Sequence, residues 1–240
     1  MSPDHRDIQL ENARPSTNAV TIRAEAVTHR GPRHAQNEDS FFSSPETGLF
    51  AVADGMGGHR DGHLASAAVI EEIAGLRQYP LAQAFGHKVA AVDAAIHRAN
   101  ERLYRAYLDQ PELGITGTTV VSLVLCGDLA TCLWSGDSRL YLFRADHLFL
   151  LSEDHTDNVG RLTNAIGADA DPGLEQRTIE VLRGDTFVLC TDGLFKGITE
   201  TELADCLADW SDGAADRLLF KAIDGGSRDD ITFIIAQVAG

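Results

Sequence analysis

The chain has 240 residues, of which 44% are hydrophobic, and its 36 acidic side chains outnumber 20 basic ones, giving a net charge of −16. This length and apolar content suit one large core in a single domain. A surface this acidic repels nucleic acids and anionic membranes, so we expect no nucleic-acid partner. No stretch approaches the roughly 20 apolar residues of a membrane span and the polar N-terminus lacks a signal-peptide core, so we expect a cytoplasmic protein.

The first part of the chain changes from a polar segment to strand-like patterns. Residues 1–19 have no apolar period and are predicted to be a disordered leader, which leaves residues 20–240 as the domain. Alternating apolar residues predict a strand at 20–27, and the continuous apolar run at 48–53 predicts a buried strand that ends at Asp54.

The middle of the chain carries helical spacing first and strand-like spacing afterwards. Apolar residues recur with a helical period at 64–76 and 82–108. Residues 117–144 then contain three strand-like runs, with turns at 127–128 and 136–137.

The last third mixes both patterns. Residues 175–190 are predicted to form a hairpin that turns at 183–185. Thr199 and Glu202 have the spacing of a capping box, which opens a helix to about residue 209. A further helix and a last strand follow at residues 213–223 and 231–238. Helices in two pairs and strands in blocks favour α+β layers over an alternating parallel sheet.

The four cysteines are spaced too irregularly for a Cys-x-x-Cys pair. They are Cys126, Cys132, Cys190 and Cys206. Because they lie within apolar runs, we expect buried thiols in a reducing compartment rather than a redox or zinc site.

Five short acidic motifs lie far apart in the chain, and most of them follow an apolar run. They are Asn37-Glu38-Asp39, Asp54-Gly55-Met56-Gly57-Gly58-His59, Gly136-Asp137-Ser138-Arg139, Thr191-Asp192-Gly193 and Arg228-Asp229-Asp230. Their carboxylates should therefore project from strand ends or turns. Hard oxygen ligands suit Mg²⁺ or Mn²⁺ rather than zinc. His59 and His63 have the spacing of a helical zinc pair, but the glycines around them argue against a continuous helix there.

In order and residue type, these motifs resemble the metal-dependent protein phosphatases of the PPM, or type 2C, family over roughly residues 22–238. The resemblance implies an α+β fold: a four-layer αββα sandwich with two central antiparallel sheets flanked by helix pairs and a metal site at one edge of the sheets. It also implies hydrolysis of phosphoserine and phosphothreonine in proteins by a metal-activated water. The cofactors would be two Mn²⁺ or Mg²⁺ ions and, as in bacterial relatives, a third.

The resemblance also assigns roles to individual residues. Asp54 would bridge two metals. The other implied ligands are the Gly55 carbonyl, Asp39, Asp192 and Asp229, with Glu38 acting through water, Asp137 on the third metal and His59 as general acid. Alternatives stay open: Asp137 lies in a turn-like Gly-Asp-Ser run and could be only a turn residue, and His59 could be a loop residue that only forms hydrogen bonds. Asp192-Gly193 could likewise be a simple turn at a strand end.

The phosphate-binding position departs from the family pattern. His34 stands where the family usually has an arginine, and Arg33 is its neighbour. Arginine suits a phosphate because its planar fork donates two hydrogen bonds. Either Arg33 or His34 contacts the phosphate, or Arg33 is a solvated loop charge. We expect Arg139 to form an ion pair that supports the site rather than to hold phosphate.

The flap of the family is nearly absent. Asp154-His155-Thr156 is followed almost at once by the run at 162–167. A cleft without a flap should be more open and less selective, or it relies on a partner for selectivity.

The leading hypothesis is a protein serine/threonine phosphatase that opposes a bacterial Ser/Thr kinase. The short form and the run at 131–139 are similar to phosphatases associated with type VI secretion. A pseudophosphatase that only binds phosphoproteins is the alternative suggested by His34 and the missing flap, although every proposed carboxylate ligand is present. A phosphatase of small phosphate esters is the third reading.

Overall fold

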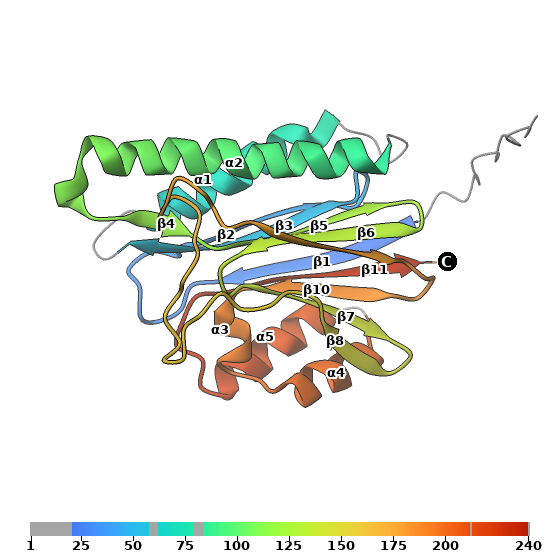
Figure 1. Ribbon diagram of the computed structural model, residues 1–240. Coiled ribbons are helices and arrows are strands. Elements are labelled where there is room, and N and C mark those ends of the chain that lie inside the picture. Colours follow the sequence, from blue (N-terminus) through green and yellow to red (C-terminus); the bar gives the residue numbers. More distant parts are fainter. Residues whose placement is uncertain (1–20, 58–61, 79–83, 212, 240) are drawn as a thin grey trace, which may run out of the picture.

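Two antiparallel β-sheets pack face to face, and helices cover the outer face of each sheet (Figure 1). The structure is a computed structural model that describes residues 21–57, 62–78, 84–211 and 213–239. This arrangement confirms the predicted four-layer αββα sandwich. The leader predicted at residues 1–19 lies outside the described residues.

The first sheet has five strands in the order β1-β11-β10-β7-β8. They are β1 (Thr21–His29), β11 (Ile231–Ala239), β10 (Thr186–Cys190), β7 (Arg139–Arg144) and β8 (His147–Leu150). Each neighbouring pair is antiparallel, and β11 lies in full register beside β1 from end to end. The first described strand therefore forms one edge of this sheet, and the last described strand pairs with it along its whole length.

The second sheet follows the order β2-β3-β5-β6-β9, with β4 paired to the end of β3. Its strands are β2 (Asp39–Ser44), β3 (Leu49–Gly57), β4 (Thr116–Thr118), β5 (Val120–Cys126), β6 (Leu129–Ser135) and β9 (Glu175–Glu180). The sequence patterns missed β2 and β8, which are short and carry no clear alternation.

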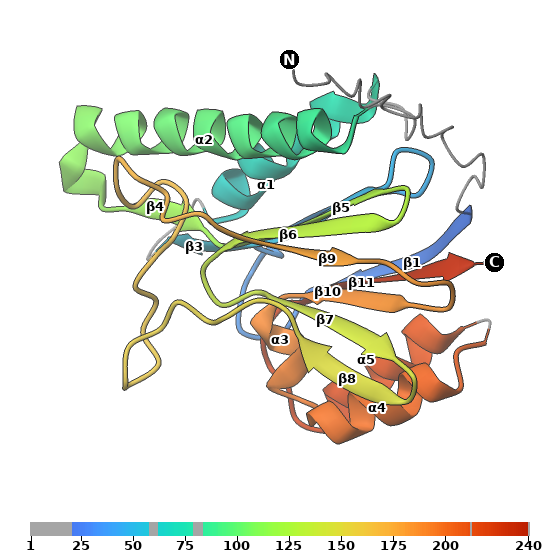
Figure 2. The same ribbon diagram turned by 45° about the vertical axis from the view of Figure 1, so that its right-hand side comes forward.

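The helices form the two outer layers (Figure 2). On the second sheet lie α1 (Gly62–Ala74) and α2 (Phe85–Asp109), and on the first lie α3 (Asp192–Phe195), α4 (Glu200–Ala208) and α5 (Ala214–Asp224). The long helix α2 buries Val92, Ala95, Ile96 and Ala99, which recur every three or four residues. This one-sided stripe is why the segment forms a helix and lies along the sheet.

Strand β5 shows how the core is divided between the layers. Its residues are buried almost throughout, because both faces of the sheet are covered. Val121 and Leu123 pack between the two sheets, whereas Val120 and Val124 pack under the helices. Successive side chains of a strand point to opposite faces, so one apolar run supplies two core layers.

The predicted hairpin at residues 175–190 is wrong. Strand β9 pairs with β6 in one sheet, whereas β10 pairs with β7 and β11 in the other. The turn between them, with Gly184 at φ 90°, carries the chain from one sheet to the other. Both runs read as strands next to a tight turn, and only the burial of each run against a different layer separates them.

The segment between β8 and β9 forms an irregular loop that projects from the sandwich (Figure 2). Residues 151–174 contain no helix or strand, and two isolated bridges, Thr156–Leu162 and Thr118–Ile166, fold the loop back on itself and onto β4. The family flap was expected to be nearly absent from this part of the chain. The segment found there is this irregular loop, which contains no helix or strand.

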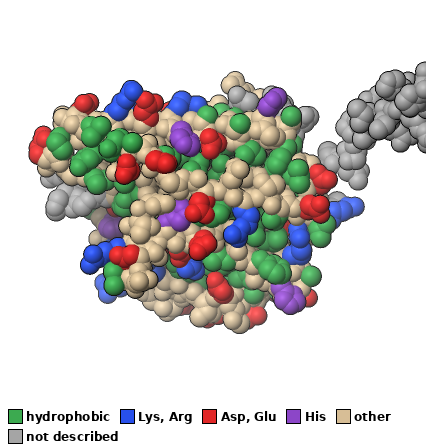
Figure 3. All heavy atoms as spheres, in the orientation of Figure 1, with side chains coloured by type: hydrophobic (Ala, Val, Ile, Leu, Met, Phe, Trp, Pro, Cys, Tyr) green, Lys and Arg blue, Asp and Glu red, His purple; other side chains and the backbone are tan. Residues whose placement is uncertain are grey.

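Acidic side chains are spread over the visible face rather than gathered in one patch (Figure 3). None of the described helices combines the length and apolar character needed to cross a bilayer. Cys132 and Cys190 are buried as expected, whereas Cys126 and Cys206 are only half-buried, and no disulfide joins the four.

Candidate metal centre

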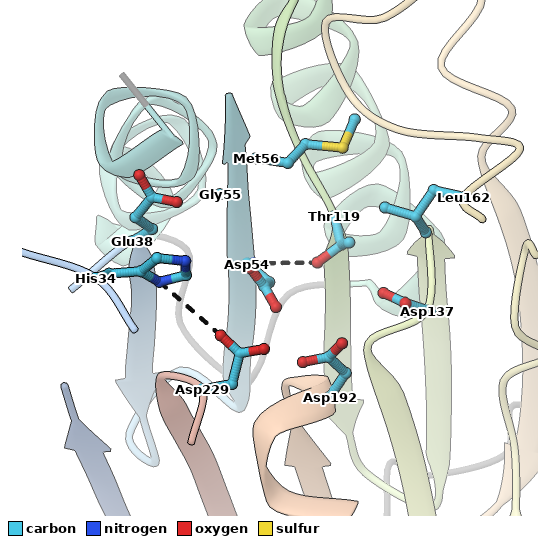
Figure 4. Close-up of a pocket in the computed structure, with 10 residues that line it drawn as sticks. All are labelled: His34, Glu38, Asp54, Gly55, Met56, Thr119, Asp137, Leu162, Asp192 and Asp229. Atoms are coloured by element: carbon cyan, nitrogen blue, oxygen red, sulfur yellow. Dashed lines mark hydrogen bonds and ion pairs between the residues drawn. The ribbon is translucent and has the colours of Figure 1, made fainter. Parts of the chain in front are cut away.

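A cleft at one edge of the two sheets collects most of the predicted site residues. It has a volume of about 440 Å³. Its lining consists of His34, Glu38, Asp54, Gly55, Met56, Thr119, Asp137, Leu162, Asp192 and Asp229 (Figure 4). Asp54, Asp137, Asp192 and Asp229 approach a common space from four separate segments (Figure 4). The carboxylates that are scattered in the sequence are thus neighbours in the fold.

Asp39 and Asp54 lie directly opposite each other on neighbouring strands. They are register partners in the β2–β3 pair, so their side chains stand on the same face of the sheet. Asp39 is only 8% exposed. The hydroxyl of Thr191 donates a hydrogen bond of 2.9 Å to its Oδ2, whereas its Oδ1 has no partner.

The backbone of Asp54 is fixed by two threonines. The Asp54 N–H donates to the hydroxyl of Thr119 at 3.0 Å, and the Asp54 carbonyl accepts from the hydroxyl of Thr118 at 2.8 Å. The Thr119 hydroxyl in turn lies 2.7 Å from that of Ser138. The threonines therefore hold the strand that carries Asp54 and link it to the turn beyond Asp137.

Asp137 lies in the tight turn between β6 and β7. Gly136 has a φ of 106°, a backbone conformation that favours glycine. The Gly136 N–H donates to Nδ1 of His155 at 3.2 Å, and the His155 N–H donates back to the Gly136 carbonyl at 3.0 Å. Asp137 is thus a turn residue whose side chain also faces the cleft.

Asp192 opens the short helix α3, so the motif is more than a turn at a strand end. A Cβ atom added to the following Gly193 would overlap the carbonyl oxygen of Asp230. Glycine is therefore needed for α3 to lie against the segment that carries Asp229 and Asp230. One oxygen of Asp192, Oδ1, is buried without a partner.

Lys196 is a cation inside this acidic site. Its ammonium contacts Oδ2 of Asp192 and donates to Oδ2 of Asp229 at 2.8 Å. Burial by itself would raise the pKa of Asp229, but the hydrogen bond and charge of Lys196 outweigh it and lower that pKa. Burial would likewise lower the pKa of Lys196, and its two carboxylate partners raise it instead.

The remaining carboxylates are harder to ionise. Burial, reinforced by neighbouring carboxylates, raises the pKa of Asp54 well above its usual range and that of Asp137 to about 6. Burial also raises the pKa of Asp39 to about 7 and that of Asp192 above its usual value. Anions crowded in this way lack positive charge, which a divalent cation would supply.

These residues fit a divalent cation in type and charge. Asp39 and Asp192 each present a buried carboxylate oxygen without a hydrogen-bond donor, and a cation is the partner such an oxygen accepts. The acidic cleft offers oxygen ligands, which Mg²⁺ and Mn²⁺ prefer. In the described part of the chain, these carboxylates line one cleft, but no group of three or more acidic, histidine or cysteine side chains is already arranged to hold a metal ion. Lys196 holds two of the carboxylates instead.

Asp230 braces the loop that approaches the cleft. Its side chain accepts hydrogen bonds of 2.8 Å from the N–H groups of Gly31 and Glu38. Nδ1 of His34 lies 3.0 Å from the same carboxylate, and this hydrogen bond raises the pKa of His34. The second acid of the Asp229-Asp230 pair is therefore bound to backbone and imidazole, while Asp229 faces the cleft.

The two candidate phosphate contacts are placed differently. His34 lines the cleft, with Nδ1 turned to Asp230. Arg33 has a side chain 60% exposed and lies 3.2 Å from Oδ2 of Asp229. His59, the predicted general acid, lies outside the described residues.

Arg139 forms the predicted ion pair. Its guanidinium donates to Asp154 with a shortest distance of 2.7 Å and stacks over the ring of Phe195 at 3.8 Å. These contacts tie the loop after β8 to α3, next to Asp192, so Arg139 supports the site.

Three residues of the site were missed by the sequence analysis. They are Thr119, Thr191 and Lys196. Thr191 precedes Asp192 in its motif, and Lys196 follows Asp192 by four residues, a spacing that brings side chains together on a helix. Thr119 carried no usable signal, because its partners lie 65 and 19 residues away.

Known proteins with similar sequences and folds share this architecture. The protein phosphatase 2C family profile matches residues 29–221. The serine/threonine protein phosphatase PstP of Mycobacterium tuberculosis is 30% identical over 240 aligned positions, which cover 91% of this chain and 45% of that protein. The chain therefore spans about half the length of this relative.

Solved structures of other proteins also match this fold. PppA, described as a key regulatory component of T6SS in Pseudomonas aeruginosa, matches with a TM-score of 0.83 and 32% identity, covering 90% of this chain and 97% of that one. The catalytic domain of PstP in complex with two manganese ions matches with a TM-score of 0.79 and 32% identity, covering 91% and 99%. With the profile match over most of its length, the chain belongs to the protein phosphatase 2C family.

Proposed function

We propose that this chain hydrolyses phosphoserine and phosphothreonine in proteins and that it depends on Mn²⁺ or Mg²⁺. The observation that supports this most is the convergence of carboxylates from separate segments on one cleft, together with the family match. A manganese-bound relative at 32% identity supports the choice of metal.

In this proposal, Asp54 would help to hold two ions. Asp39, Asp192, Asp229 and the Gly55 carbonyl would supply their other ligands, and Asp137 would hold a third ion together with Asp192. When bound, such ions supply a Lewis acid for the phosphate and a water of lowered pKa. The hydrogen bonds from Thr119 to Asp54 and from Thr191 to Asp39 keep the ligands oriented, as partners of metal ligands generally do.

The other site residues handle protons and the substrate. Glu38 lines the cleft, and burial raises its pKa, so it is suited to hold a water by hydrogen bonding. Arg33 or His34 binds the phosphate, and His59 protonates the leaving oxygen of serine or threonine.

Similarity to relatives supports a physiological setting for this activity. A Ser/Thr kinase would supply the phosphoprotein substrate. Similarity to PppA favours a role in regulating type VI secretion. Loss of the gene should then leave a kinase substrate of that system hyperphosphorylated, and unchanged phosphorylation would contradict this role.

The reaction is tested with a phosphothreonine peptide and with p-nitrophenyl phosphate, each with Mn²⁺, Mg²⁺, Ca²⁺ or EDTA. We expect turnover of the peptide with Mn²⁺ and Mg²⁺, little with Ca²⁺ and none with EDTA, because longer and looser Ca²⁺ coordination suits the site poorly. Peptide binding without turnover would favour a pseudophosphatase. Turnover of the small ester alone would favour a small-molecule phosphatase.

A further inference from the structure

Lys196 pairs with carboxylate oxygens of Asp192 and Asp229 that a metal ion held by these two residues would also need. The short helix α3 ends at Phe195, and Lys196 follows it, four residues after Asp192. Its ammonium contacts Oδ2 of Asp192 and lies 2.8 Å from Oδ2 of Asp229. Both carboxylates are proposed metal ligands: Asp192 is the first residue of α3, whereas Asp229 lies in the loop between α5 and β11.

The ammonium of Lys196 acts as a counter-ion that is covalently attached to the chain. A lysine carries a compact charge on a flexible stem, and this side chain is 42% exposed, so it has an open path to solvent. Asp229 is 14% exposed and Asp192 16%, so their mutual repulsion is poorly screened by water. The ammonium lowers that repulsion by pairing with both.

We propose that Lys196 competes with a divalent cation for Asp192 and Asp229, and so sets how tightly the protein holds the ion that these two residues share. This inference rests on the metal site of the proposed function. Binding of that ion requires Lys196 to release both carboxylates, and the displaced charge stays close by on its tether. Both effects weaken metal binding. The pairing of Lys196 with the two carboxylates stabilises the protein when metal is scarce.

Arg33 does not duplicate this role. It reaches only Asp229, at 3.2 Å, and its side chain is more exposed than that of Lys196, at 60% against 42%. Of the described basic side chains for which a contact with these two carboxylates is observed, only Lys196 joins them to each other.

The test is the affinity for Mn²⁺, measured by calorimetry on protein stripped with a chelator. We expect Lys196→Met and Lys196→Gln to bind one Mn²⁺ about ten- to a hundredfold more tightly than the wild type, since a charge-assisted pair no longer has to be broken. Lys196→Arg keeps the charge and should stay close to the wild type. Lys221→Met is the matched control, because it removes a lysine from the same helical layer at an exposed site on α5.

A second readout is thermal unfolding. In EDTA, Lys196→Met should melt at a lower temperature than the wild type, and saturating Mn²⁺ should close that gap; Lys221→Met should show neither effect. An affinity of Lys196→Met and Lys196→Gln equal to or weaker than that of the wild type overturns the inference while leaving the metal site intact. Failure of every variant and of the wild type to bind Mn²⁺ overturns both proposals together.

Discussion

Asp54 and Asp192 are both held in position by their neighbours in the fold. Two threonines hold the backbone of Asp54, and Asp192 opens α3 at a glycine contact that only glycine permits. Each faces the cleft with a pKa raised by burial. Their positions are therefore set before any ligand arrives, as expected for groups that bind a cation.

Replacing either residue should remove metal-dependent turnover. We expect Asp54→Ala or Asp192→Ala to lower kcat by more than about 100-fold, because even the loss of residues that only support metal ligands costs about 10- to 100-fold. The fold should survive, since the change relieves repulsion between buried carboxylates. Asp109→Ala, at the exposed end of α2, is the control. Activity within tenfold of the wild type would refute the assignment.

Arg33 and His34 are the two candidate phosphate contacts: the guanidinium of Arg33 is exposed, and the imidazole of His34 is held by Asp230. We expect Arg33→Ala to raise KM for a phosphopeptide more than His34→Ala does, because only the guanidinium can donate two parallel hydrogen bonds. Lost charge-assisted bonds of about 1.5–3 kcal/mol correspond to roughly ten- to a hundredfold in kcat/KM.

Steady-state kinetics on both variants decide the matter. Arg98→Ala, which removes an arginine paired with Glu72 on the outer helices, serves as the control. His34→Arg restores the family pattern and should tighten phosphate binding. A silent Arg33→Ala beside a severe His34→Ala would make the histidine the phosphate contact.

At the scale of elements, short local signals decide where helices begin. The predicted capping box is present at the start of α4: the Thr199 hydroxyl accepts from the Glu202 N–H at 3.2 Å, and Oε2 of Glu202 accepts from the Thr199 N–H at 2.9 Å. Both partners lie within four residues, so the sequence was sufficient to identify them. This cap defines the residue at which α4 begins.

Removing the cap should cost stability and not catalysis. We expect Thr199→Ala to lower the free energy of unfolding by about 1 kcal/mol, because an N–H group of the first turn loses its acceptor. Thr201→Ala, on the same helix at an exposed position, should have no comparable effect. Urea denaturation measures the difference, and equal midpoints for the two variants would contradict it.

For the whole molecule, the acidic cleft links stability to pH. Burial raises the pKa of Asp39 to about 7 and that of Asp137 to about 6, compared with about 3.9 in an unfolded chain. Between those values, the folded protein holds protons that the unfolded chain has lost, so stability falls as pH rises. His34 acts in the same direction, because its hydrogen bond to Asp230 raises its pKa.

In the presence of a chelator, the melting temperature should therefore fall from pH 6 to pH 8. Each fully shifted group contributes a slope of up to about 1.4 kcal/mol per pH unit. Asp39→Asn cannot lose this proton, so it should show a shallower slope, and Mn²⁺ should flatten the wild-type curve by favouring the charged carboxylates. A melting temperature that rises over this range in EDTA would contradict the prediction.

The sequence alone determined the local features of this protein. Alternating and continuous apolar runs identified most strands, helical spacing identified α1 and α2, and the acidic motifs identified the family and the oxygen-rich character of the site. These signals are local, because they depend on side-chain periodicity and on turn residues within a few positions of each other.

Only the tertiary structure decided which distant segments meet. It separated β9 from β10 into different sheets, placed Asp39 opposite Asp54, and brought Lys196 between Asp192 and Asp229. An isolated strand can pair with several others, and a lysine can reach many carboxylates, so neither choice is encoded by spacing. The choice depends on which pairing buries the apolar face of every layer at once, and that is a property of the whole sandwich.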